Sequence, residues 1–168
     1  MKTPPLNLEE LFRSQITELH ATEKKLLKSF ESLSAATQTD ELRSALSAER
    51  SAQADHVSRL ALVLQSLKMK ATRDSDTISE ELLKQVSEVT GYKKQQDLFK
   101  DVQILHCLKA VYSIKIARYS SLQLIAANLE MKHPAILLAQ SLEESKNNFA
   151  YLIQIEQNII YPAAIKII

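Results

Sequence analysis

Residues 8–33 read LEELFRSQITELHATEKKLLKSFESL and decide the class of fold. Apolar side chains recur every three or four positions along this stretch, which is the period of one face of an α-helix. They are Leu8, Leu11, Phe12, Ile16, Leu19, Leu26, Leu27, Phe30 and Leu33. Asn7 is a good N-cap residue, and Glu9 and Glu10 stand in the first turn, where the helix dipole favours acidic side chains. We therefore expect a long amphipathic helix that ends at the polar residues Thr37-Gln38-Thr39.

The next part of the chain predicts a second long helix and a short third one. The second begins after a cap at Thr39 or Asp40, and its apolar positions run on to Leu67. A charged connection, residues 68–76, follows it. Asp76 or Thr77 then caps a short helix that reaches about residue 89, and Gly91 is suited to a left-handed C-cap.

The last part of the chain predicts two more long helices. One runs from about Gln95 to Leu129. Pro134 suits the first position of the other, because a proline there lacks only an N–H that has no partner in a helix. We expect this last helix to reach about Ile160 and to be stopped by Pro162.

The amino-acid composition supports the same class. The chain has 168 residues but a single glycine, and glycine supplies the backbone conformations of tight turns and phosphate-binding loops. A P-loop, a dinucleotide-binding fingerprint and a hairpin-rich β-fold are therefore excluded. We expect one all-α domain over residues 1–168, a four-helix bundle with one crossover connection that carries the short extra helix.

Charge and hydropathy limit the partners. The formal net charge is only +1 and aromatic residues make up 5%, which disfavours a nucleic-acid-binding protein. No 18-residue apolar run predicts a membrane span, and the N-terminal residues do not resemble a signal peptide. Cys107 is the one cysteine, which is typical of a reducing compartment. We expect a cytoplasmic protein that binds neither nucleic acid nor membrane.

Polar residues interrupt the apolar rows near the middle of the long helices. They are Glu23; Glu49, Gln53 and His56; Tyr112 and Lys115; and Gln140, Glu144 and Asn147. In an antiparallel bundle such positions converge on one internal layer. Taken singly, Glu23 has the alternative of a boundary residue that reaches solvent, and His56 that of a packed, hydrogen-bonded histidine. Because an unpaired buried charge costs several kcal/mol, a layer of this kind must be paired, bound to metal or hydrated.

Several segments resemble a known family. Residues 8–12, LEELF, and residues 18–28, ELHATEKKLLK, are similar to the opening helix of the bacterial YciF/YciE-type ferritin-like proteins. Weaker similarity extends over nearly the whole chain, for example at residues 56–60 and 142–146. The resemblance implies a ferritin-like bundle, a link to stress responses, and a carboxylate-rich centre able to hold two metal ions. Such a di-metal centre takes about six ligands, mainly Glu and His.

The ligand pattern is kept only in part. Glu23, Glu143 and Glu144 match the family, and Glu49 and His56 stand near its second-helix cluster. Other family positions carry residues that do not bind metals well. They are Ser51, Ala52, Ala54, Tyr112, Lys115 and Gln140.

Lys115 leads to our first interpretation, because its ammonium brings a positive charge to the place of a metal ligand. We expect a bundle without catalysis or cofactor, in which a hydrogen-bonded Lys–carboxylate network replaces the metal site. Its residues are Glu23, Gln53, His56, Tyr112, Lys115, Gln140 and Glu144. The alternative for Lys115 is that its side chain extends outward along the bundle surface.

A second interpretation is enzymatic. In this interpretation the chain is a divergent di-iron or manganese oxidase, or a peroxide-scavenging protein. Iron and manganese prefer oxygen and imidazole ligands. Its metal ligands would be Glu23, Glu49, His56, Glu143 and Glu144. It requires Lys115 to turn away from the centre.

The C-terminal residues 159–168, IIYPAAIKII, are strongly apolar. They are too short and too interrupted to span a bilayer. We expect either the interface of a homodimer or a tail that packs back onto its own bundle.

Overall fold

The computed structural model describes residues 4–92 and 98–166, and every regular element within these ranges is helical. This confirms the all-α class. The elements are α1 (Leu8–Ala36), α2 (Asp40–Ser66), α3 (Thr77–Gly91), α4 (Leu98–Asn128), α5 (Lys132–Ile155), the π-helical turn η1 (Glu156–Ile160) and α6 (Tyr161–Ile165). The predicted start of the fourth helix at Gln95 lies outside the described residues. Within the described ranges, no helix is both long and apolar enough to cross a membrane.

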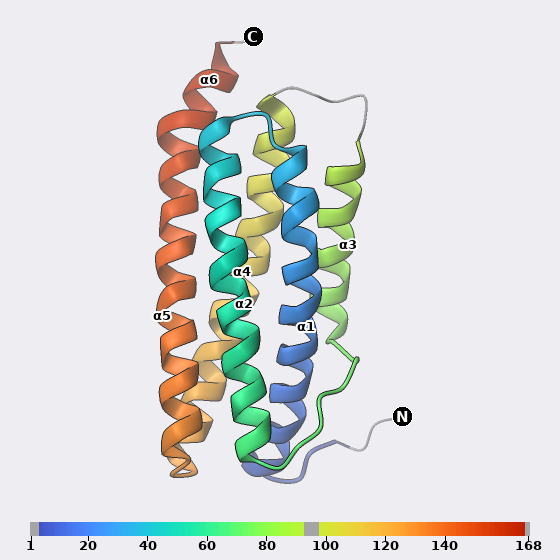
Figure 1. The fold of residues 1–168 in the computed structure, drawn as a ribbon, viewed down its shortest axis with the longest axis vertical. Coiled ribbons are helices and arrows are strands. Elements are labelled where there is room, and N and C mark those ends of the chain that lie inside the picture. The colour runs from blue at the N-terminus through green and yellow to red at the C-terminus, as the bar shows by residue number, and fades with distance from the viewer. Residues whose placement is uncertain (1–3, 93–97, 167–168) are drawn as a thin grey trace.

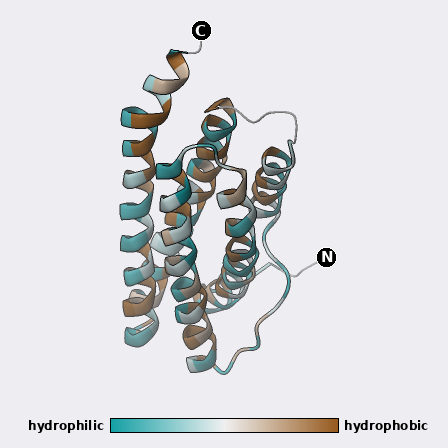
Figure 2. Ribbon diagram, turned by 45° about the horizontal axis from the view of Figure 1, so that its top comes forward, coloured by the Kyte–Doolittle hydropathy of each residue, from teal (hydrophilic) through white to brown (hydrophobic). Residues whose placement is uncertain are grey.

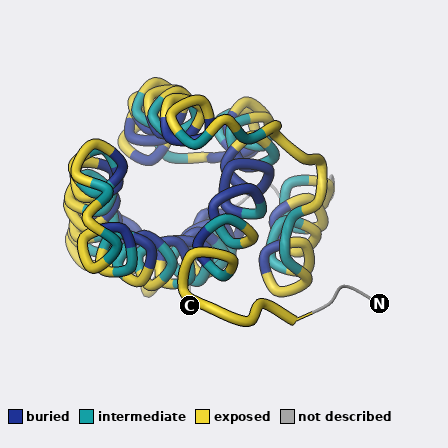
Figure 3. The backbone as a smooth tube through the Cα atoms, turned by 90° about the horizontal axis from the view of Figure 1, so that it is seen from below, coloured by how far each residue is buried: buried dark blue, intermediate teal, exposed yellow. Residues whose placement is uncertain are grey.

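The four long helices form the predicted bundle. α1 and α5 run in one direction, and α2 and α4 run in the other (Figure 1). The chain therefore crosses the length of the bundle between α2 and α4, and α3 lies on this crossover against α1 and α4. Viewed along the bundle, buried residues face the axis that the four long helices share, and α3 lies outside them (Figure 3). This arrangement confirms the ferritin-like fold class.

Two predicted helix caps are confirmed. The Asn7 side-chain oxygen accepts a hydrogen bond from the Glu10 backbone N–H at 2.8 Å. The Asp76 side chain accepts one from the Ser79 backbone N–H at 2.9 Å at the start of α3. Each cap satisfies a backbone donor that has no partner within its helix.

The predicted left-handed cap at Gly91 is wrong. Gly91 is the last residue of α3, no glycine has positive φ, and the chain leaves through Tyr92 at φ −68° and ψ 89°. Among the described residues the left-handed positions are Lys68, at φ 54°, and Glu130, at φ 57°. Both follow a helix end at which the sixth-to-first hydrogen bond of a Schellman motif forms, for example from the Met69 N–H to the Leu64 carbonyl at 2.9 Å.

Both proline predictions also need correction. α5 begins at Lys132, so Pro134 is its third residue, still within the first turn, where an N–H has no acceptor in the helix. Pro162 does not stop the last helix. The helix widens into η1, where the Tyr161 N–H bonds to the Glu156 carbonyl, and then continues as α6. In a regular α-helix the ring of Pro162 would clash with the carbonyl of the residue four positions before it, and the wider π-helical turn accommodates this ring.

Among the described residues, the hydrophobic core forms two clusters. One contains Leu26 and lies around the ends of α1 and α5 that are distant from the N-terminus, and the other contains Leu19. Glu23, which stands between these two leucines on α1, is buried. In Figure 2 the middle turns of α5 are largely hydrophilic, and hydrophobic segments lie on either side of them. A polar layer therefore separates the two clusters.

Candidate functional site

Lys115, Glu23 and Gln53 form the centre of the polar layer. The Lys115 Nζ donates to the Gln53 Oε1 at 2.6 Å and lies 3.0 Å from the Glu23 Oε2. The Gln53 Nε2 in turn donates to the Glu23 Oε2 at 2.5 Å and to the Glu23 backbone carbonyl at 3.0 Å. The amide of Gln53 thus bonds to both charged partners, and three helices, α4, α1 and α2, are joined.

The charge of this centre is balanced inside the protein. The Lys115 side chain is 3% exposed and the Glu23 side chain 1% exposed. Burial alone would raise the pKa of Glu23, but the Lys115 ammonium and the neighbouring His56 outweigh it and hold the pKa below its usual value. The Glu23 carboxyl is therefore an anion at neutral pH, and the Lys115 ammonium is its buried counter-ion.

His56 connects the centre to the surface. Its Nδ1 lies 3.7 Å from the Glu23 Oε2, and its Nε2 lies 2.9 Å from the Glu144 Oε2. Two nitrogens of Arg59 donate to the same Glu144 carboxylate at 2.6 and 2.7 Å. The pKa of Glu144 is lowered chiefly by these hydrogen bonds from Arg59. The His56 ring also meets the Tyr119 ring edge-on, with centroids 5.7 Å apart.

A second buried carboxyl, Glu49, lies in the same layer and interacts electrostatically with Lys115. The Tyr112 hydroxyl and the Asn148 amide both donate to its Oε2, the amide at 2.9 Å. Burial raises the pKa of Glu49 above its usual value despite these hydrogen bonds. The Lys115 Nζ lies 5.2 Å from the centre of the Tyr112 ring, in the geometry of a cation–π contact. Tyr112 thus fills the space between the lysine and Glu49.

The structure brings most of the predicted network residues together. Glu23, Gln53, His56, Tyr112 and Lys115 are buried in one layer, and Glu144 reaches it from α5. The alternative in which Lys115 extends outward does not agree with its burial.

Three predicted positions on α5 lie elsewhere. Gln140, Glu143 and Asn147 are exposed, and the Glu143 carboxylate faces Lys146 at 3.7 Å on the surface. The placement of these residues in the centre was wrong, because the buried face of α5 is turned by one residue from the predicted one. Its inward positions include Ser141 and Ser145, both completely buried.

Sequence reasoning missed two participants, Arg59 and Asn148. Arg59 stands three residues after His56, the spacing at which two side chains share a helix face. Asn148 follows Glu144 by four residues, so it lies on the same side of α5. These spacings were the available signals.

The donor set does not fit a pair of metal ions. Glu23 is bonded to Lys115 and Gln53, and Glu144 to Arg59 and His56. In the described ranges, no group of three or more His, Cys, Asp or Glu side chains is arranged to hold a metal ion. The centre presents an ammonium where a di-metal site needs further carboxylates.

The fold and the polar layer define a ferritin-like four-helix bundle. Residues 7–164 match the family model described as a domain of unknown function, DUF892, and the chain belongs to this family. The chain is also 25% identical over 140 residues to protein YciF of Escherichia coli strain K12. The aligned region covers 83% of this chain and 84% of that protein.

Two solved structures share the fold. The crystal structure of the E. coli stress protein YciF has a TM-score of 0.85 at 24% identity and covers 92% of this chain and 97% of that chain. YcfI from Rhodopseudomonas palustris has a TM-score of 0.83 at 20% identity and covers 90% and 96%, respectively. The predicted resemblance to YciF-type proteins is confirmed.

Proposed function

We propose that this chain is a non-catalytic ferritin-like bundle whose Lys115 ammonium takes the place of the metal ions. The observation that carries the proposal is the contact of 3.0 Å between the Lys115 Nζ and the Glu23 Oε2, with both side chains buried. The bundle then keeps the polar layer of its fold class but needs no inorganic ion to neutralise it.

Electrostatics support this assignment. At a separation of 4 Å and an effective dielectric constant near 20, two unit charges interact by about 4 kcal/mol, and a divalent ion doubles that value. A metal ion bound to Glu23 would therefore be repelled by Lys115 on the order of several kcal/mol. It would also have to displace the hydrogen bond of Gln53 to the same carboxylate.

We further propose a stress-related role exerted through protein contacts in the cytoplasm, as a homodimer. The name of the E. coli stress protein YciF supports the first part. The second is supported by α6, which has no buried residue and carries Ile165 at 69% exposure. Sedimentation at increasing concentration, with and without the residues after Tyr161, tests the dimer. A monomer at all concentrations would contradict it.

Metal analysis tests the central claim. Protein purified without chelators should contain well under one iron, manganese or zinc ion per chain. In Lys115→Glu a fourth carboxylate joins the layer, and its melting temperature should rise with added Mn²⁺, as ligand linkage requires. Lys84→Glu, at an exposed position of α3, is the control and should show no such rise.

The enzymatic alternative, an oxidase or peroxide scavenger, remains an outcome of the same experiment. Stoichiometric iron or manganese in the wild-type protein, together with ferroxidase turnover, would overturn the proposal. A Lys115→Glu variant that folds but ignores Mn²⁺ would show that Lys115 does not stand in for a metal ion.

A further inference from the structure

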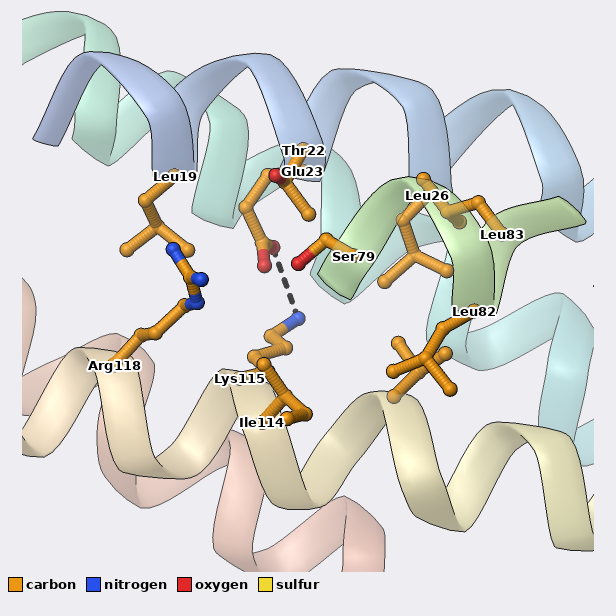
Figure 4. Close-up of a pocket in the computed structure, with 11 residues that line it drawn as sticks. Leu19, Thr22, Glu23, Leu26, Ser79, Leu82, Leu83, Ile114, Lys115 and Arg118 are labelled. Atoms are coloured by element: carbon orange, nitrogen blue, oxygen red, sulfur yellow. Dashed lines mark ion pairs between the residues drawn. The ribbon is translucent and has the colours of Figure 1, made fainter. Parts of the chain in front are cut away.

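A small pocket adjoins the Lys115–Glu23 pair under α3. Its walls come from α1, α3 and α4, and its polar lining includes Glu23, Ser79, Lys115 and Arg118, while the rest is mainly apolar. Figure 4 shows the side chains of Glu23, Ser79 and Lys115 pointing toward one another inside it. The free space in the pocket holds about one water molecule.

Two buried side-chain oxygens in the lining of this pocket, the Glu23 Oε1 and the Thr22 Oγ1, have no hydrogen-bond partner in the described part of the chain. The Glu23 Oε2 contacts the Lys115 ammonium and accepts a hydrogen bond from the Gln53 amide. The Glu23 Oε1 accepts no hydrogen bond from the described part of the chain. A buried carboxylate oxygen left without a donor destabilises the fold, because it has lost its hydrogen bonds to water and gained none within the protein. The Glu23 side chain is only 1% exposed, so bulk solvent does not supply the donor.

Lys115 offers the complementary group. An ammonium has three N–H donors, and its contacts with Gln53 and with the Glu23 Oε2 use two of them. The third N–H and the Glu23 Oε1 are thus a donor and an acceptor beside one pocket. A water molecule can accept from the first and donate to the second, with the Ser79 hydroxyl as a further partner, which gives the two to four polar partners that a buried water needs.

Arg118 stands at the boundary between this pocket and a surface groove. Arg118 and Ile114 line both the inner pocket and an outer groove between α1 and α4, which also contains Gln15 and Ser121. The Arg118 Nη2 lies 2.7 Å from the Asp76 Oδ1, and Asp76 is the N-cap of α3. This ion pair fixes the guanidinium at that boundary and ties the start of α3 to α4.

We propose that one water molecule is an integral part of this pocket, bridging Lys115 to the Glu23 Oε1, and that the Arg118–Asp76 pair closes its exchange route. The water completes the hydrogen bonds of the buried pair, so the proposal deepens the Lys–carboxylate network and rests on it. The site selects a neutral molecule with both donor and acceptor groups, because the two charges beside it already balance.

A high-resolution crystal structure and ¹⁷O magnetic relaxation dispersion test the proposal on the full chain. We expect one ordered water within hydrogen-bond distance of the Glu23 Oε1 and the Lys115 Nζ. In Arg118→Ala the water should remain, with a residence time about tenfold shorter, as follows from losing a partly buried ion pair from the exchange barrier. Arg43→Ala, which removes another guanidinium–aspartate pair at the start of α2, should leave the residence time unchanged.

The outcomes separate this site from the proposed function. A map that shows other buried waters but none at the Glu23 Oε1 overturns the water site and leaves the metal-free network standing. An unchanged residence time in Arg118→Ala overturns the closing role of Arg118. Anomalous scattering from a metal ion beside Glu23 overturns the network itself.

Discussion

The Lys115 Nζ lies 3.0 Å from the Glu23 Oε2, and neither side chain has more than 3% of its surface exposed. Both charges have left water, so their attraction and the hydrogen bonds of Gln53 must offset two desolvation penalties. The value of such a pair lies less in net stability than in the penalty for breaking it. If Lys115 is the counter-ion of Glu23, removing one charge of the pair should cost much more stability than removing both.

Lys115→Met removes the charge and keeps the length of the side chain. It leaves the Glu23 carboxylate buried without a counter-ion, so we expect a loss of about 3–5 kcal/mol in the free energy of unfolding. The double variant Lys115→Met with Glu23→Leu should recover most of this loss, because no uncompensated charge remains. Urea denaturation measures both.

Lys146→Met is the matched control, since Lys146 also lies near a glutamate, Glu143, but both are exposed. It should change stability by less than about 0.5 kcal/mol. A loss of equal size in Lys115→Met and in the double variant would contradict the pairing and point to packing alone.

The two buried glutamates of the layer should have opposite pH dependence. The pKa of Glu23 is lowered in the folded state, so its stabilising contribution is complete above its ordinary pKa of 4.5 and is lost as the pH falls through the folded value. The pKa of Glu49 is raised by burial, so its contribution is greatest below 4.5 and declines as the pH rises through the folded value.

Glutamine substitutions read out this difference. At neutral pH, Glu23→Gln should be destabilised by about 2–4 kcal/mol, and the deficit should shrink in acid. Glu49→Gln should equal or exceed the wild type at neutral pH, because the amide oxygen still accepts from Tyr112 and Asn148 without the cost of a buried charge. The free energies of unfolding of both variants and the wild type, measured from about pH 3 to pH 8, test these expectations. Parallel curves for the two variants would be incompatible with the assigned shifts.

Sequence reasoning reached the helices and most of the polar layer for a physical reason. In α1 large buried apolar residues, among them Ile16, Leu19 and Leu26, recur at helical spacing, so an interrupting Glu23 stands out. The Lys115–Gln53 contact follows less directly, since it depends on the relative heights of α2 and α4, which no local pattern encodes.

The inward face of α5 was misassigned because its central buried positions carry serines. Ser141 and Ser145 are completely buried, and Ser145 donates to the Ser141 carbonyl at 2.7 Å. The Ser141 hydroxyl accepts a hydrogen bond from Arg59 on α2, and neither serine gives a hydrophobic signal. The row one residue away, which carries Gln140, Glu144 and Asn147, was therefore taken as the inward face.

Asp101 connects α4 to the turn between α1 and α2. Its Oδ1 accepts the Gln38 N–H at 2.8 Å, and its Oδ2 accepts the Thr39 N–H at 2.8 Å and the Thr39 hydroxyl at 2.5 Å. Because Asp101 is completely buried, Asp101→Ala leaves these donors unpaired, and we expect a loss of about 2–4 kcal/mol. Urea denaturation and faster amide exchange at Gln38 and Thr39 measure it.

Asp101→Asn should retain roughly half of the lost stability, because only one of its side-chain atoms accepts hydrogen bonds. Asp40→Ala, at an exposed aspartate of the same turn, should cost less than about 1 kcal/mol. Equal losses at positions 101 and 40 would mean that the turn is not held from α4.

The helix ends offer a prediction about the backbone alone. Lys68 has a left-handed backbone conformation, φ 54°, which costs any residue with a Cβ about 1 kcal/mol. Lys68→Gly should therefore raise the free energy of unfolding by about 0.5–1 kcal/mol.

Gly91 lies in a right-handed helix, and a Cβ added there would have nothing within 4 Å. Gly91→Ala should therefore also raise the free energy of unfolding, by roughly 0.5–1 kcal/mol. For a chain of this size each change corresponds to a melting temperature higher by about 1–4 °C in calorimetry. Lys84→Gly, in the exposed interior of α3, is the opposite control and should lower stability by about 1 kcal/mol. If glycine at position 68 lowered the melting temperature, as we expect it to do at position 84, the Schellman end of α2 would be disproved.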